Sequence, residues 1–170
     1  MFKRIMIPIE TKEKSETAIS IAYEFAQLQK SEIILFNVIS SKSLDVMTEE
    51  KEQEEEGEGT EVEKGADTQE EITETLTDIE REERRKALEE DRYKMLYAVK
   101  RTAPDNRMKV FIDIVEGDPA TKISEVARKN KVDLIIMPKS GKIGPRRVLV
   151  GDIALKVAEM TDIPLMLITS

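Results

Sequence analysis

The stretch MKVFIDIVEGDPATKISEVARKNKVDLIIM, residues 108–137, decides the fold class of this chain. Its two ends, 108–115 and 132–137, are apolar runs rich in β-branched residues, which is typical of buried strands. Between them Asp118 is a good N-cap and Pro119 suits the first turn of a helix. Apolar residues then recur at helical spacing, at Ile123, Val126 and Ala127. A strand, a helix and a strand joined by short connections predict a parallel pair with a right-handed crossover.

The same alternation runs through the rest of the chain. Further strands are predicted at 5–9, 32–39 and 164–169, and a helix is predicted to begin near Gly151. After the first strand, Ser15 is the expected N-cap of a helix whose apolar positions are Ala18, Ile21, Ala22, Phe25 and Ala26. We therefore predict an α/β fold, an open five-stranded parallel sheet with helices on both faces.

An acidic insert interrupts this pattern within a single domain spanning residues 1–170. Between Glu49 and Arg92 there are 20 acidic and 7 basic residues, a net charge of −13. Since the whole chain has a formal charge of −8, the remaining residues carry a net charge of +5. We expect the insert, at about 45–68, to be mobile, because it offers almost nothing apolar to offset its ordering entropy. It leads into a long helix predicted over about 69–102, whose later apolar residues are expected to pack on the sheet.

The composition narrows the possible chemistry. The chain has no cysteine and no histidine, which excludes disulfides, zinc sites with thiolate or imidazole ligands, and Ser/His or Cys/His nucleophiles. We therefore expect no enzymatic activity. No stretch approaches the ~18 consecutive apolar residues of a membrane span, and the amino terminus lacks a secretory signal pattern. The cytoplasm is the expected location, and no membrane partner is expected.

The segment PKSGKIGPRRVLVGDIA, residues 138–154, has the features of an anion site. It follows the fourth strand, on the edge where open α/β sheets bind ligands. Its glycines permit close backbone approach, and a helix amino terminus supplies free N–H groups. Positive charge surrounds it, from Lys139, Lys142, Arg146 and Arg147. The alternative is an ordinary loop on a mildly basic body.

Four segments resemble the universal stress protein family: IMIPIE, EIILFNVI, VEGDPATKISEVARKNKVDLIIMP, and the Gly141–Gly151 loop together with PLMLIT. The third is the most specific, because the family shows a Gly-x-Pro-Ala helix start followed by an Asp-Leu-Ile strand. The resemblance implies an adenine-nucleotide-hydrolase-like fold with strand order 3-2-1-4-5. It also implies a homodimer formed through the last strand, here Pro164–Thr169.

The resemblance further implies a nucleotide site in an altered form. Nucleotide-binding members carry a Gly, two residues, Gly, nine residues, Gly-Ser/Thr pattern. Here the second and third glycines are Gly141 and Gly151, whereas Pro138 takes the first glycine position and Asp152 the Ser/Thr position. The candidate nucleotide-binding residues are Pro8, Ile9, Glu10, Val38, Met137, Pro138, Lys139, Gly141, Arg147, Gly151, Asp152 and Ile153.

The two departures weaken the predicted phosphate site. Pro138 has no N–H to donate. Asp152 is expected to cap the following helix, to occupy the anion site itself and to repel phosphate. Two like charges at ~4 Å and an effective dielectric near 20 cost about 4 kcal/mol, which is roughly three decades of affinity. Compensation by Arg146 and Arg147, or by a Mg²⁺ ion bridging Asp152 and a phosphate, is the alternative.

Three functions follow as hypotheses. The first is a non-enzymatic, dimeric signalling or interaction protein of the stress-protein type with weak or no ATP binding. The second keeps ATP with Mg²⁺, with slow or no hydrolysis, and uses Glu10 and Asp152 as metal or water ligands; no other metal site is expected. In the third, the acidic insert is a docking element for a basic protein partner or a lid over the body, against the simpler interpretation of a solvated loop. Nucleic-acid binding is not expected, because basic residues are not interleaved with aromatic ones.

Overall fold

The sheet has the predicted topology. The computed structural model describes residues 2–41, 43–44, 68–139 and 151–168, with the backbone alone along 68–77. Five parallel strands lie in the order β3-β2-β1-β4-β5, which confirms both the fold class and the strand order. The strands are β1 (Arg4–Pro8), β2 (Glu32–Ile39), β3 (Val110–Glu116), β4 (Leu134–Pro138) and β5 (Leu165–Ile168).

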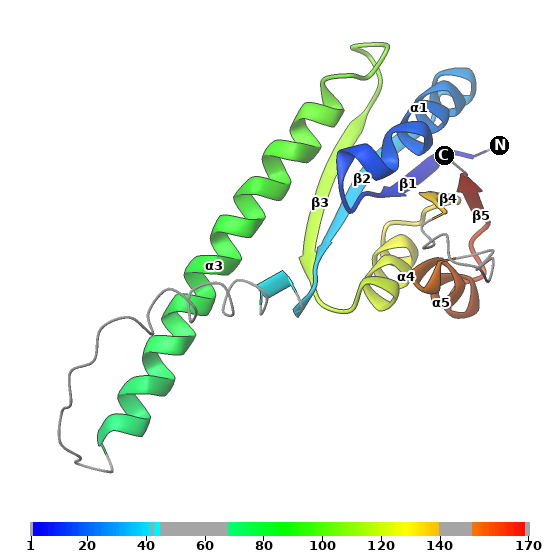
Figure 1. Ribbon diagram of the computed structural model, residues 1–170. Helices are drawn as coiled ribbons and strands as arrows, with labels where there is room; N and C mark the ends of the chain where they lie inside the picture. The colour runs from blue at the N-terminus through cyan, green and yellow to red at the C-terminus, as the bar shows by residue number, and fades with distance from the viewer. Residues whose placement is uncertain (1, 42, 45–67, 140–150, 169–170) are drawn as a thin grey trace, which may run out of the picture.

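Helices cover both faces of this sheet (Figure 1). They are α1 (Lys12–Gln29), α3 (Thr68–Lys100), α4 (Pro119–Lys129) and α5 (Asp152–Met160). Helices α1 and α3 share one hydrophobic cluster with the sheet, and α4 and α5 share the other. Strand β1 contributes to both clusters in alternation, because Ile5 and Ile7 face α1 while Met6 faces the opposite side. The core therefore lies on either side of β1, which places the end of β1 at the centre of the molecule.

Two predicted helix starts have different outcomes. Asp118 caps α4 as predicted, since its Oδ1 accepts a hydrogen bond from the Thr121 N–H at 3.0 Å and Pro119 follows it. The prediction of Ser15 as the cap of the first helix was wrong. Thr11 is the N-cap, with Oγ1 accepting from the Lys14 N–H at 3.4 Å, and Ser15 lies fully buried in the first turns of α1. Thr11 is the cap because its backbone is extended, and the residue types of the sequence alone do not show which hydroxyl residue has that conformation.

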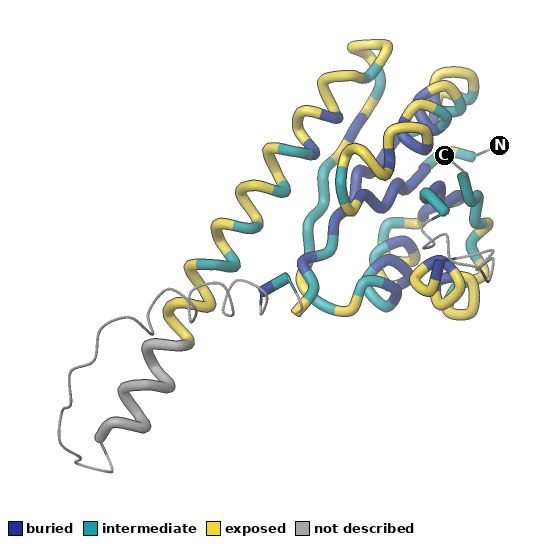
Figure 2. Tube along the Cα trace, viewed as in Figure 1, coloured by how far each residue is buried: buried dark blue, intermediate teal, exposed yellow. Residues whose placement is uncertain are grey.

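The long helix α3 has two distinct parts. Near its carboxyl end Leu96 and Val99 are buried against the sheet, as predicted for the later apolar group. No residue from Asp78 to Asp91 is buried, and the Ile79 side chain is 52% exposed, so this part projects from the body (Figure 2). The acidic insert that precedes α3 lies outside the described residues. None of the described helices is long and apolar enough to cross a membrane.

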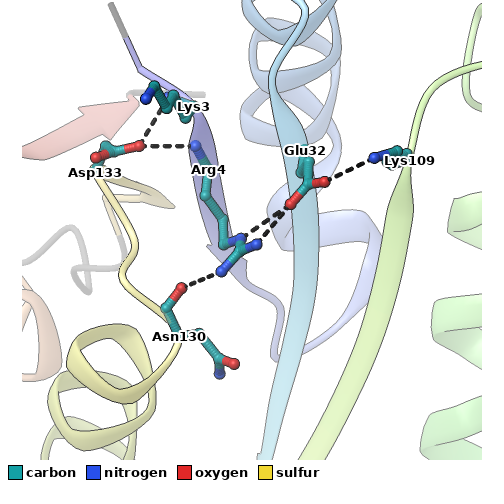
Figure 3. Close-up of polar contacts among 6 residues, drawn as sticks. All are labelled: Lys3, Arg4, Glu32, Lys109, Asn130 and Asp133. Carbon is teal, nitrogen blue, oxygen red and sulfur yellow. Dashed lines mark hydrogen bonds and ion pairs between the residues drawn. The ribbon is translucent and has the colours of Figure 1, made fainter.

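A polar network ties together the amino-terminal ends of the strands (Figure 3). The Arg4 guanidinium donates to Glu32 Oε2 at 2.7 and 3.1 Å and to the Asn130 carbonyl, and Lys109 Nζ reaches Glu32 Oε1 at 3.1 Å. The Asp133 carboxylate accepts from the backbone N–H of Arg4 at 2.9 Å. Hydrogen bonds from Arg4 and then Lys109 hold the pKa of Glu32 below its usual value. The polar groups at this end of the sheet are therefore paired with one another.

Candidate functional site

The carboxyl ends of β1, β2 and β4 bring most of the predicted site residues to one edge of the sheet. Strand β1 pairs with β2 on one side and with β4 on the other. The direction of strand order reverses between β1 and β4, and such a point is where open α/β sheets bind ligands. The residues placed there are Pro8 at the end of β1 and Ile9 and Glu10 after it, Val38 near the end of β2, Met137, Pro138 and Lys139 at the end of β4, and Gly151, Asp152 and Ile153 at the start of α5. Gly141 and Arg147 lie outside the described residues.

The connection from β1 to α1 is held by side chains from two other elements. The Ile9 N–H donates to the Phe36 carbonyl at 2.8 Å, which continues the β1–β2 pairing beyond Pro8. Asn37 Nδ2, from β2, donates to the Ile9 carbonyl at 2.6 Å. Arg92 Nη1, from α3, donates to the Glu10 carbonyl at 3.3 Å. The backbone that would line a ligand here is thus positioned by β2 and α3 as well as by its own strand.

Glu10 is not a free carboxylate. Both of its oxygens lie 3.1 Å from Lys14 Nζ, one turn along the chain. Both side chains are more than half exposed, so the pair adds little stability. It does offset the negative charge of Glu10 locally. Among the described residues no group of three or more Asp, Glu, His or Cys side chains is placed to hold a metal ion.

The amino terminus of α5 differs from the prediction. Gly151 is the N-cap, with extended backbone at φ −68° and ψ 149°, and no side chain of the described residues caps the helix. The prediction that the Asp152 carboxylate caps α5 was wrong, because Asp152 is already the first helical residue and lies beyond the capping position. Its exposed carboxylate still lies in the first turn, where the helix dipole favours negative charge. The anion position is therefore left unfilled by this side chain, and the charge next to it remains.

Pro138 lies in the final position of β4 and is fixed against β5. It is in register with Ile168, and the next residue, Lys139, donates its N–H to the Ile168 carbonyl at 2.7 Å. Pro138 itself has no N–H, so the end of β4 presents one donor fewer than a glycine would provide. The Lys139 N–H is also engaged by the sheet. The backbone leading out of β4 thus offers no free donor at either residue.

Two buried polar atoms at this end of the sheet have no hydrogen-bond partner among the described residues. They are Asn37 Oδ1 and Ser15 Oγ, on side chains that are 3% and 0% exposed. Leaving such a group unsatisfied costs about 1–3 kcal/mol. Native proteins retain buried unpaired groups rarely, and usually where solvent, an ion or a ligand completes them. Both atoms belong to elements that frame the β1–α1 connection.

A hollow at the opposite end is a different feature. It measures about 230 Å³ and is lined by Arg4, Ile34, Phe111, Ile112, Asp113 and Asn130. That volume is below the ~300–1,000 Å³ of typical small-molecule sites. Its Arg4 side chain is already committed to Glu32. We therefore place the candidate site at the carboxyl edge of the sheet.

Three residues at the candidate site were not identified from the sequence. Asn37 had a usable signal, because it is the one polar residue within the apolar run 33–39. Lys14 follows Glu10 by four residues, a weak sign of helical pairing, since Glu10 precedes the helix. Arg92 had no signal, because 82 positions separate it from Glu10.

Comparison with known proteins agrees with this geometry. Residues 1–169 match the model of the universal stress protein family. Universal stress protein MJ0577 of Methanocaldococcus jannaschii is 27% identical over 171 residues, covering 99% of this chain and 95% of the relative. The solved structure of MJ0577 superposes with a TM-score of 0.69 at 25% identity, covering 100% of this chain and 97% of that one.

Two other proteins are also similar. Universal stress protein MJ0531 of M. jannaschii is 36% identical over 81 residues, so the alignment spans about half of each chain, 48% in both cases. A universal stress protein from Archaeoglobus fulgidus, solved in complex with dAMP, shares the fold at 13% identity with a TM-score of 0.53, covering 97% of this chain and 96% of that one. The whole-chain family match, the sheet order and the placement of the site residues lead to one conclusion. This chain belongs to the universal stress protein family.

Proposed function

We propose that this protein is a non-enzymatic, dimeric signalling or interaction protein that binds an adenine nucleotide weakly. The observation that carries the proposal is the start of α5, where no side chain of the described residues caps the helix and the Asp152 carboxylate is exposed in the first turn. A phosphate entering there meets free helix N–H groups and a like charge together. The relative from A. fulgidus that binds dAMP supports an adenine nucleotide as the ligand class.

Weak binding follows from two features that act in the same direction. The Asp152 charge opposes a phosphate, and Pro138 with Lys139 leaves no backbone donor at the end of β4. At ~4 Å and an effective dielectric near 20 the repulsion reaches about 4 kcal/mol, and solvent around an exposed carboxylate reduces it. Binding at high nucleotide concentration suits a sensor better than a tightly held cofactor.

The side chains at the site support a role without catalysis. The sequence holds no histidine and no cysteine, the residues that most often act as base or nucleophile. Glu10, which follows β1, is paired with Lys14. Its pairing also weakens the case for a metal ligand at this position.

A dimer through β5 is supported by the difference between the two edge strands. All four residues of β5 are apolar and only half-buried, and β5 is the last strand of the sheet among the described residues. The other edge, β3, carries Asp113 and Glu116. Charged residues on an edge strand discourage pairing with another chain. Pairing through β5 buries its exposed apolar surface, whereas pairing through β3 would bury carboxylates.

One observation favours the second candidate, an ATP-binding protein that uses Mg²⁺ with slow or no hydrolysis. Because Asp152 makes no cap, its carboxylate is available to share a Mg²⁺ ion with phosphate oxygens. In that case the same residue attracts the metal–nucleotide complex. The two candidates therefore predict opposite effects for one substitution.

Calorimetric titration of ATP, with and without Mg²⁺, separates them. Under the proposal, Asp152→Ser tightens binding by about tenfold, because a repelling charge is removed. The matched control Asp162→Ser removes an exposed carboxylate beyond the other end of α5 and leaves the affinity unchanged. Loss of Mg²⁺-dependent binding in Asp152→Ser supports the second candidate. A low-micromolar dissociation constant for the wild type contradicts weak binding.

A further inference from the structure

Helix α3 leaves the body of the protein close to Arg92. On the carboxyl side of this residue, Leu96 and Val99 are buried, and Tyr23 Oη from α1 donates to the Val99 carbonyl at 2.9 Å. On its amino side no residue from Asp78 to Asp91 is buried. Burial of the Tyr23 hydroxyl at this junction raises its pKa to about 12, so it stays protonated and remains a donor. The carboxyl-terminal turns of α3 are thus fixed to the core, whereas residues 78–91 project.

The projecting part of α3 is supported by ion pairs along its own surface. Pairs at spacings of three and four residues stabilise a helix without packing. They are Glu80–Arg84 at 3.8 Å, Glu82–Arg85 at 2.9 Å, Arg85–Glu89 at 2.9 Å, Glu82–Lys86 at 3.8 Å and Glu90–Lys94 at 2.8 Å. These pairs support helical structure in a part of α3 that does not pack on the core.

Arg92 connects that point to the candidate site. Its Nη1 donates to the carbonyl of Glu10, the residue that follows β1 and Ile9. The guanidinium presents five N–H donors in a rigid plane, so a single side chain can hold a loop carbonyl in a defined place. The same loop is held by Asn37 through the Ile9 carbonyl. The β1–α1 connection is therefore linked to β2 through Asn37 and to α3 through Arg92, and the second link lies at the base of the projecting part of α3.

We propose that Arg92 is a positioning residue that couples the nucleotide site to α3. The inference rests on the proposed function, since it takes the Glu10 backbone to line the nucleotide. Occupancy of the site fixes the β1–α1 connection, and Arg92 passes this restraint to the turn of α3 where the projecting part begins. Coupling of this kind is reciprocal, so a protein that binds the projecting part changes the affinity for nucleotide by the same factor.

Chemical-shift titration of the full-length, ¹⁵N-labelled protein with ATP and Mg²⁺ tests the proposal, because it detects weak binding. In the wild type, amide signals of residues 92–100 move in parallel with that of Glu10. In Arg92→Gln the movement in α3 is lost, and the dissociation constant rises by on the order of fivefold. Arg92→Lys, which keeps a cationic donor, restores part of both effects. The control Arg101→Gln, an exposed arginine just beyond α3, behaves as the wild type.

The outcomes separate the two proposals. If the wild type binds nucleotide and Arg92→Gln shows the same α3 movement and the same affinity, the coupling is wrong and the proposed function stands. If the wild type shows no shift at any concentration, the proposed function fails and the coupling fails with it. A purely structural role for Arg92 lowers the melting temperature of Arg92→Gln but leaves the α3 response to nucleotide intact, which also overturns the proposal.

Discussion

The two ends of the parallel sheet differ in whether their buried polar groups have hydrogen-bond partners among the described residues. At the amino-terminal end Arg4, Glu32 and Lys109 satisfy one another, and Asp133 accepts from the backbone of β1. At the carboxyl end Asn37 Oδ1 and Ser15 Oγ are buried without partners among the described residues, and α5 begins without a side-chain cap. Satisfied polar groups stabilise a fold, whereas a buried group without a partner calls for an explanation such as bound water, an ion or a ligand. The difference is consistent with the proposal that nucleotide binds at the carboxyl end, while the amino-terminal end contributes stability.

Disrupting the polar network at the amino-terminal end of the sheet is expected to have the largest effect on stability. Arg4→Met removes the donor for Glu32 and for the Asn130 carbonyl, and leaves a partly buried carboxylate with Lys109 alone. We expect the free energy of unfolding to fall by about 1.5–3 kcal/mol, measured by urea denaturation. The control Arg101→Met, at an exposed position, should change it by less than about 0.5 kcal/mol. Equal small effects for both variants would remove the distinction between the two ends.

At the carboxyl end of the sheet, removing the Ser15 hydroxyl is expected to raise the free energy of unfolding. Ser15→Ala deletes a buried hydroxyl that has no hydrogen-bond partner in the described part of the chain and improves helix propensity, so stability should rise by about 0.5–1 kcal/mol. Ser124→Ala is the matched control, because Ser124 is also buried within a helix but donates to the Ala120 carbonyl at 2.9 Å. Thermal unfolding of both variants makes the comparison. If Ser15→Ala is the more destabilising, its hydroxyl has a bound partner.

The ion pairs of Glu32 at the amino-terminal end of the sheet should also make stability depend on pH. The pKa of Glu32 is lowered from its ordinary value of 4.5 by hydrogen bonds from Arg4 and Lys109. Because the folded pKa lies below the unfolded one, this contribution is complete above pH 4.5 and is lost as the pH falls through the folded value. Glu32→Gln should therefore lose less stability on acidification than the wild type, by a few tenths of a kcal/mol. Parallel curves for the two proteins would show that Glu32 does not contribute.

Much of the fold could be predicted because it depends on local pattern. Apolar β-branched runs such as 32–39 identify strands buried on both faces, and Asp118 with Pro119 identifies a helix start. The strand order came from the family resemblance rather than from residue spacing. Ser15 was misassigned because capping depends on the backbone conformation at Thr11, which hydroxyl spacing does not determine.

The candidate site was predicted less completely than the fold. Residues that the strand ends bring together, such as Glu10 and Pro138, were named as site residues through the family resemblance. The contacts around them could not be predicted, because Arg92 reaches the Glu10 carbonyl from a helix that is distant in the sequence, and the ion pair between Lys14 and Glu10 depends on where α1 begins. Asp152 was placed in the right turn of α5 and given the wrong role, since one residue separates a cap from the first helical position.

An amide chemical-shift map of the wild-type protein, with increasing concentrations of AMP and of ATP with Mg²⁺, tests the placement of the nucleotide site most directly. We predict shifts at the carboxyl edge, at Glu10, Val38 and Asp152, with saturation only at high nucleotide concentration. We predict no shifts around the hollow at the opposite end, near Phe111 and Asn130. Shifts that cluster at that hollow, with the carboxyl edge unchanged, would contradict the assignment of the two ends.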